Sequence, residues 1–142
     1  MDKNLLIYPM AFYAFWMFLI ALNLFRVRVK TLKNREVSFK YFKAYTDTAT
    51  LPEYAKVAER HYENQFEVPT MFFPTGVMYF ALGMANPLTL GLMWLFVASR
   101  VAHTFIHLGS NNVRFRMISF FIGWLAIVAL WAQAVYFVCK AH

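Results

Sequence analysis

The stretch LLIYPMAFYAFWMFLIALNLF, from Leu5 to Phe25, contains no charged residue. A run of this length matches the ~20 apolar residues that a helix needs to cross the hydrocarbon core of a bilayer. The run is too long and too aromatic for the apolar region of a cleaved signal peptide, and no small-residue cleavage site follows it. We therefore predict that it is a retained membrane-spanning helix.

Further apolar runs extend this prediction to the whole chain. The 142 residues are 61% hydrophobic and 15% charged, whereas soluble domains have about 45–50% apolar and about 25% charged residues. The pair Asn86–Pro87 and the segment Gly109–Asn112 predict tight turns between the later runs. We expect an all-α integral membrane protein. Its single domain, 1–142, is predicted to be a four-transmembrane-helix bundle with spans at about 5–25, 62–85, 88–108 and 114–138.

The second helix is predicted to be longer than the bilayer requires. It begins near Leu51, where Thr50 and Glu53 fit a capping box, and it runs to about residue 85. At ~1.5 Å per residue this helix exceeds the ~30 Å hydrocarbon core, so its first turns lie in the aqueous phase or at the interface. Pro69 and Pro74 are expected to kink it.

Lysine and arginine are concentrated on one side of this topology. The turn at Asn86–Pro87 has no charge, and the ends of the chain contribute only Lys3 and Lys140. The positive-inside rule then places both termini outside the cytoplasm, and the absence of a sorting signal fits a bacterial inner membrane. The net charge of +7 reflects this topology and contact with anionic headgroups, so no nucleic-acid partner is expected. The cytoplasmic basic residues are Arg26, Arg28, Lys30, Lys33, Arg35, Lys40, Lys43, Lys56, Arg60, Arg114 and Arg116.

Three polar residues follow one face of the second helix near its cytoplasmic end. Arg60, Asn64 and Glu67 are spaced four and three residues apart, which places them within about 60° of one another on a helix. Charged residues inside a span are costly and are therefore candidates for function. In a structural alternative, Arg60 lies at the interface with its charge in water, and Glu67 pairs with Arg100 to tie two helices together.

The other helices bring polar groups to the same depth. We expect these groups to form a cationic pocket with one carboxylate and one amide, which suits a small zwitterionic ligand with net negative charge, because arginines bind carboxylates through paired hydrogen bonds. In the structural alternative, Arg114, like Arg60, lies at the interface with its charge in water. The residues from the other helices are Arg26, Arg28, Arg100, His103, Thr104, His107, Arg114 and Arg116.

His103 and His107 also allow a different interpretation. Histidines at positions i and i+4 can hold a metal ion or a haem. A histidine pair alone is weak evidence for a metal site, and two arginines close by would repel a cation. No metal site is therefore predicted, and a metal or haem protein is kept as the least favoured alternative.

Two stretches resemble the MAPEG family, the membrane-associated proteins in eicosanoid and glutathione metabolism. RHYENQFE, which contains R-x3-N-x2-E and is followed by a proline, resembles the second-helix signature of the family. RVAHTFIHLG is similar to the third helix of its prostaglandin E synthase members, and FRVRVK is similar to the arginine-rich end of the first helix. The resemblance implies a homotrimer of four-helix subunits that bind glutathione near the cytoplasmic side, between neighbouring subunits.

The resemblance also implies roles for individual residues. Arg60, Asn64 and Glu67 match glutathione-binding positions, Arg26 matches an arginine that reaches the ligand across the subunit interface, and His103 matches a contact position. The arginine that stabilises the glutathione thiolate is Arg116 by alignment with the prostaglandin E synthase members, and Arg114 by alignment with the leukotriene synthase members. The chain departs from the family pattern at His107, Met117 and Phe120, where hydroxyl side chains are replaced.

The resulting hypothesis is a glutathione-dependent transferase or peroxidase that acts on lipophilic electrophiles or lipid hydroperoxides. Its partners are glutathione, a hydrophobic small molecule or lipid, and the bilayer. The alternative is a non-catalytic membrane binding or assembly subunit, because the missing hydroxyls affect turnover more than they affect binding.

Overall fold

The computed structural model describes residues 1–44 and 51–141, and these residues fold into helices and turns without any strand. The predicted all-α class is therefore confirmed. The helices are η1 (Lys3–Leu6), α1 (Ile7–Lys33), α2 (Phe39–Ala44), α3 (Glu53–Glu63), η2 (Asn64–Phe66), α4 (Pro69–Ala81), α5 (Pro87–Leu108) and α6 (Val113–Ala141).

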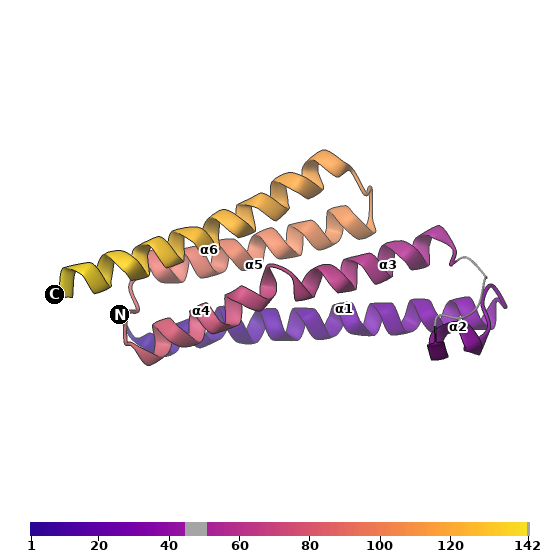
Figure 1. Ribbon diagram of the computed structural model, residues 1–142, viewed down its shortest axis with the longest axis horizontal. Helices are drawn as coiled ribbons and strands as arrows, with labels where there is room; N and C mark the ends of the chain where they lie inside the picture. Colours follow the sequence, from indigo (N-terminus) through magenta and orange to yellow (C-terminus); the bar gives the residue numbers. More distant parts are fainter. Residues whose placement is uncertain (45–50, 142) are drawn as a thin grey trace.

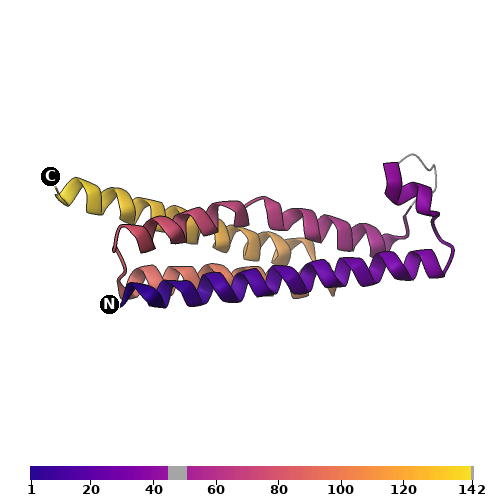
Figure 2. The same ribbon diagram turned by 90° about the horizontal axis from the view of Figure 1, so that it is seen from below.

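The longer helices form an elongated bundle with their axes roughly along its length (Figure 1). α3 and α4 follow one another end to end beside α1, while α5 and α6 pack together as a hairpin (Figures 1 and 2). Both termini lie at the end of the bundle that carries the α4–α5 turn, and the α5–α6 turn lies at the opposite end with α2. The α4–α5 and α5–α6 turns thus each join neighbouring antiparallel helices.

Within the described residues, three helices are long and apolar enough to cross a membrane. They are Lys3–Lys33, Pro87–Leu108 and Val113–Lys140, and the first extends well beyond the predicted end at residue 25. Large apolar side chains point outward from them, including Phe15 and Leu125, which are 58% and 66% exposed. Long apolar helices with outward-facing apolar side chains are what a bilayer requires, since all backbone groups are bonded within each helix.

The second predicted span is two helices rather than one kinked helix. α3 ends at Glu63, a short 3-10 turn follows, and Glu67 leaves helical geometry with φ −91° and ψ −103°. Pro69 begins α4, where its missing N–H costs no helical hydrogen bond, while Pro74 lies inside α4 without ending it. The prediction of one continuous helix was wrong because the chain breaks before the first proline.

The start of α3 also differs from the prediction. α3 begins at Glu53, and Pro52 occupies the N-cap position in an extended conformation without a side-chain cap. Thr50, the predicted capping residue, lies outside the described residues. The predicted start near Leu51 was two residues too early, because Pro52 precedes the helix as its N-cap residue.

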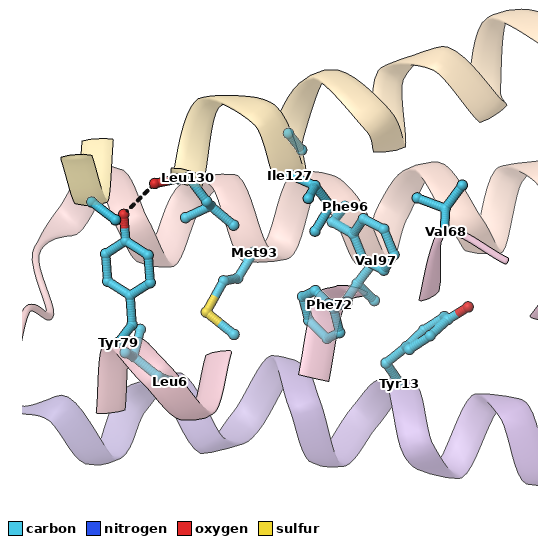
Figure 3. Packing of buried hydrophobic residues seen from close by; sticks show 12 residues of the cluster. Leu6, Tyr13, Val68, Phe72, Tyr79, Met93, Phe96, Val97, Ile127 and Leu130 are labelled. Carbon is cyan, nitrogen blue, oxygen red and sulfur yellow. Dashed lines mark hydrogen bonds between the residues drawn. The ribbon is translucent and has the colours of Figure 1, made fainter. Parts of the chain in front are cut away.

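An aromatic core joins α1, α4 and α5 (Figure 3). The rings of Phe72 and Phe96 are stacked with centroids 4.4 Å apart, and Tyr13 meets both edge-on at 5.6 and 5.5 Å. Gly76 allows a close approach, because a Cβ there would lie 2.6 Å from the sulfur of Met10. The Tyr79 hydroxyl donates to the Leu130 carbonyl at 2.5 Å, which links α4 to α6. This core holds α5 in a fixed register against the other helices.

Candidate functional site

A cavity of about 240 Å³ lies between α3, α5 and α6. Its lining residues come from the end of α3, from η2, from the last turns of α5 and from the first turns of α6. These segments lie in the half of the bundle that contains the α5–α6 turn (Figure 1). α3 and η2 supply one wall, α5 the floor, and the first turns of α6 the other wall. The lining residues are Arg60, Glu63, Asn64, His103, His107, Arg116, Met117 and Phe120.

The α3 wall is positioned by buried polar contacts behind it. Arg60 and Asn64 are one helical turn apart and face the cavity together. Gln65, next in sequence, is 3% exposed and accepts a hydrogen bond from the Tyr13 hydroxyl at 2.8 Å. Its amide nitrogen donates to the His61 carbonyl at 3.0 Å. These bonds attach the end of α3 to α1 and hold Asn64 at the cavity.

The α5 floor consists of two buried histidines. His103 and His107 are both 3% exposed, and their i, i+4 spacing puts them on one face of the helix. His103 Nδ1 lies 3.2 Å from the Arg116 carbonyl oxygen and 3.2 Å from Ser119 Oγ. His107 Nδ1 lies 3.2 Å from Nδ1 of His61. The two rings therefore connect α5 to α6 and α3.

The α6 wall begins at a capped helix end. Asn112 accepts the backbone N–H of Arg114 at 3.0 Å through its side-chain oxygen, as an N-cap residue does. Arg116 is partly buried in the cavity, and its Nη1 donates to Asn111 Oδ1 at 2.8 Å. Arg114 is exposed and lies instead beside an apolar groove. That groove is lined by Arg114, Met117, Ile118, Phe121, Ile122 and Leu125.

Arg100 does not line the cavity. It is 2% exposed, and its Nη2 donates to the carbonyl oxygens of Ser119 and Phe120 at 3.1 and 2.9 Å. Gly123 makes room for it, because a Cβ at that position would lie 2.8 Å from Nη2. The guanidinium also lies over the Phe120 ring, 5.1 Å from its centroid. Arg100 thus joins α5 to α6.

Three other predicted site residues also lie outside the cavity lining. Glu67 is exposed at the helix break, and Arg26 is exposed on α1. Arg28 forms an ion pair with Glu59 at 3.1 Å, which ties α1 to α3. The predicted stripe of Arg60, Asn64 and Glu67 loses its third member because the 3-10 turn and the break change the rotation per residue. The predicted site residues that do line the cavity, among the described residues, are Arg60, Asn64, His103, His107 and Arg116.

Sequence reasoning missed two polar residues at the site, Glu63 and His61. Glu63 lines the cavity beside Asn64. His61 is fully buried against the two histidines of α5. A signal for His61 was present, since it continues the spacing of the small buried residues Ala55 and Ala58, which marks the face of α3 that packs inward.

The cavity combines two guanidinium groups, one carboxylate, one side-chain amide and two imidazoles. The guanidiniums can bind carboxylates, and the single carboxylate can hold an ammonium group. Met117 and Phe120 add an apolar side. The arrangement is therefore suited to a small zwitterion with net negative charge that also presents a less polar part.

Comparison with known proteins places this site in a family. No curated protein matches the chain. The family model described as the MAPEG family matches residues 6–136, which include all the described helices except the beginning of η1 and the end of α6. Together with the three long apolar helices, the match identifies a membrane protein. The chain belongs to the MAPEG family.

Proposed function

We propose that the protein is a glutathione-dependent transferase or peroxidase that acts on lipophilic electrophiles or lipid hydroperoxides. The observation that carries this proposal is the single cavity in which Arg60, Asn64 and His103 lie together with Arg116. The first three are positions that the family resemblance assigns to glutathione binding. Glutathione is a zwitterion with net negative charge, which is the class of ligand that the cavity suits.

Arg116 is the residue that we assign to thiolate stabilisation. Its guanidinium faces the cavity, whereas the side chain of Arg114 lies beside the separate groove. A positive charge next to a thiol favours the thiolate and so lowers its pKa. The hydrogen bond from Arg116 to Asn111 at 2.8 Å holds the guanidinium in place before a ligand arrives.

The chemistry follows from a bound thiolate. In the transferase reaction, the sulfur forms a bond to an electrophilic carbon, and the leaving group departs with the bonding electrons. In the peroxidase reaction, the sulfur attacks a peroxide oxygen, the O–O bond breaks, and the alkoxide takes a proton to become an alcohol. A second glutathione then displaces water from the oxidised sulfur, so two glutathiones yield one disulfide.

The lipophilic substrate would approach along the groove on α6. Met117 lines both the groove and the cavity, so the two hollows meet at this side chain. The rest of the groove is apolar apart from Arg114. A substrate dissolved in the bilayer could therefore reach the thiolate without entering water, and its binding next to the thiolate would supply proximity.

A second copy of the chain would complete the site. The cavity of about 240 Å³ is smaller than the ~300–1,000 Å³ of usual ligand pockets. Arg26 and Glu67, which the resemblance assigns to glutathione, are exposed and thus free to contribute to a shared site. We therefore propose a homotrimer that binds glutathione between its subunits.

Titration calorimetry of the detergent-solubilised protein with glutathione tests the proposal. The wild type is expected to bind, and the absence of binding would refute the proposed function. Arg116→Ala is expected to reduce the ultraviolet absorbance of the bound thiolate, while Arg114→Ala, two residues away, leaves it unchanged. Loss of the thiolate absorbance in Arg114→Ala but not in Arg116→Ala would assign thiolate stabilisation to Arg114.

A non-catalytic binding subunit is the second candidate, and the apolar side of the cavity favours it. Met117 and Phe120 line the cavity at positions where the resembling family members carry hydroxyl groups. Neither side chain can donate a hydrogen bond to sulfur. Glutathione binding without conjugation of a chloro-nitro-aromatic compound, and without reduction of a lipid hydroperoxide in liposomes, would select this candidate.

A further inference from the structure

We propose that His61, His103 and His107 form a binding site for a divalent transition metal ion such as Zn²⁺. The three imidazoles come from α3 and α5 and are 0%, 3% and 3% exposed. One ring nitrogen from each lies within 4.8 Å of the others. Imidazole suits Zn, Cu, Fe and Ni, and three histidines form a known type of catalytic zinc site.

The spacing of the nitrogens supports a shared ion. Nδ1 of His61 and Nδ1 of His107 are 3.2 Å apart. Two nitrogens bound tetrahedrally to one Zn²⁺ at ~2.0–2.1 Å would be about 3.4 Å apart. This pair therefore already has the separation that coordination requires. The third ring, His103, is stacked beside His61 with centroids 5.9 Å apart, so a small shift brings its nitrogen to the same ion.

The hydrogen bonds of His103 leave a nitrogen free for an ion. Its Nδ1 is 3.2 Å from the Arg116 carbonyl oxygen, which can only accept, so this nitrogen carries the hydrogen. Nε2 of His103 then bears a lone pair, and it is buried without a partner among the described residues. Histidine ligands of metals typically donate their other N–H to a backbone carbonyl in this way.

His61 is also incompletely paired. Its Nδ1 faces His107, while its Nε2 is buried without a partner in the described part of the chain. A buried polar atom without a partner is destabilising. At the contact between His61 and His107, two neutral imidazoles can share only one N–H···N hydrogen bond, whereas a cation can accept the lone pairs of both Nδ1 atoms.

Two of the three nearby arginines are hydrogen-bonded away from the cluster, and the third, Arg60, lines the cavity beside it. The Nη2 of Arg100 donates to two carbonyl oxygens of α6, and the Nη1 of Arg116 donates to Asn111. Glu63 lines the same cavity and opposes their charge. Three neutral imidazoles would leave both positive charges on the ion, so its remaining position would favour an anionic ligand. His103 and His107 line the cavity, which puts that position within reach of a cavity ligand.

Titration of the chelator-treated, detergent-solubilised protein with Co²⁺ tests the site without any activity measurement. We expect one ion per chain and the intense visible absorption of four-coordinate Co²⁺, with Zn²⁺ competing for the same site. His61→Gln, His103→Gln and His107→Gln are each expected to weaken binding at least about tenfold. His142→Gln is the matched control, because it changes the only other histidine of the sequence and is expected to bind normally.

A further variant keeps the test decisive if a buried glutamine prevents folding. His107→Cys retains a ligand atom and is expected to add a thiolate-to-cobalt charge-transfer band. No saturable binding by the wild type, binding that depends on His142, or no such band in folded His107→Cys would overturn the proposal. Because no glutathione is present, failure of the metal site is distinguishable from failure of the proposed function.

Discussion

Arg60 and His61 are adjacent in sequence and face opposite environments. Arg60 lines the cavity, while His61 is fully buried behind it. The difference arises because successive residues on a helix point about 100° apart. Functional assignment at this site therefore depends on which side of α3 packs against α5.

Arg60→Ala is expected to weaken glutathione binding by about 1.5–3 kcal/mol, the usual contribution of a hydrogen bond to a charged group. Titration calorimetry measures the change. Lys56→Ala is the matched control, since Lys56 is exposed one turn earlier on α3 and does not line the cavity. Equal affinities of the two variants for glutathione would show that Arg60 does not contribute to its binding.

Local spacing was sufficient to predict which residues share a helix face. Arg60 with Asn64, and His103 with His107, share helix faces in the structure because each pair is four residues apart. The contacts of Arg100 could not be predicted in this way. Its partners are carbonyl oxygens of α6, and the space for it exists because residue 123 is glycine. The spacing of residues along either helix does not predict such a fit between the two.

At the scale of elements, the break between α3 and α4 determines which residues reach the cavity. Asn64 lies before the break and lines the cavity, whereas Glu67 lies at the break and is exposed. The buried bond from Tyr13 to Gln65 holds this segment against α1. The apolar runs were sufficient to predict α1, α5 and α6, but the break depends on this tertiary contact as well as on Pro69.

Tyr13→Phe is expected to destabilise the protein by about 1–3 kcal/mol, because it leaves the buried Gln65 side-chain oxygen without its donor. A lower midpoint of thermal unfolding in detergent would report this loss. Tyr8→Phe removes the same hydroxyl from a side chain that is 64% exposed on the same helix, and it is expected to change nothing. Equal midpoints for both variants would show that the Tyr13–Gln65 bond does not hold the break.

At the scale of the whole molecule, charge and chain direction act together. Both termini lie at the end of the bundle opposite the α5–α6 turn (Figure 1). The basic residues of α1, α3 and the start of α6 are concentrated toward the end that carries this turn. The candidate site lies in that half of the bundle, so the positive-inside rule predicts a site that opens toward the cytoplasm.

Labelling of Cys139 tests this orientation. Cys139 is the only cysteine of the chain and is exposed near the C-terminal end of α6. If both termini lie outside the cytoplasm, a membrane-impermeant maleimide is expected to label it in spheroplasts before lysis. Cys139→Ser combined with Ser110→Cys moves the thiol to the exposed α5–α6 turn, and it is expected to react only after lysis. The reverse pattern would invert the topology and put the candidate site on the side away from the cytoplasm, because the bundle fixes the two ends relative to each other.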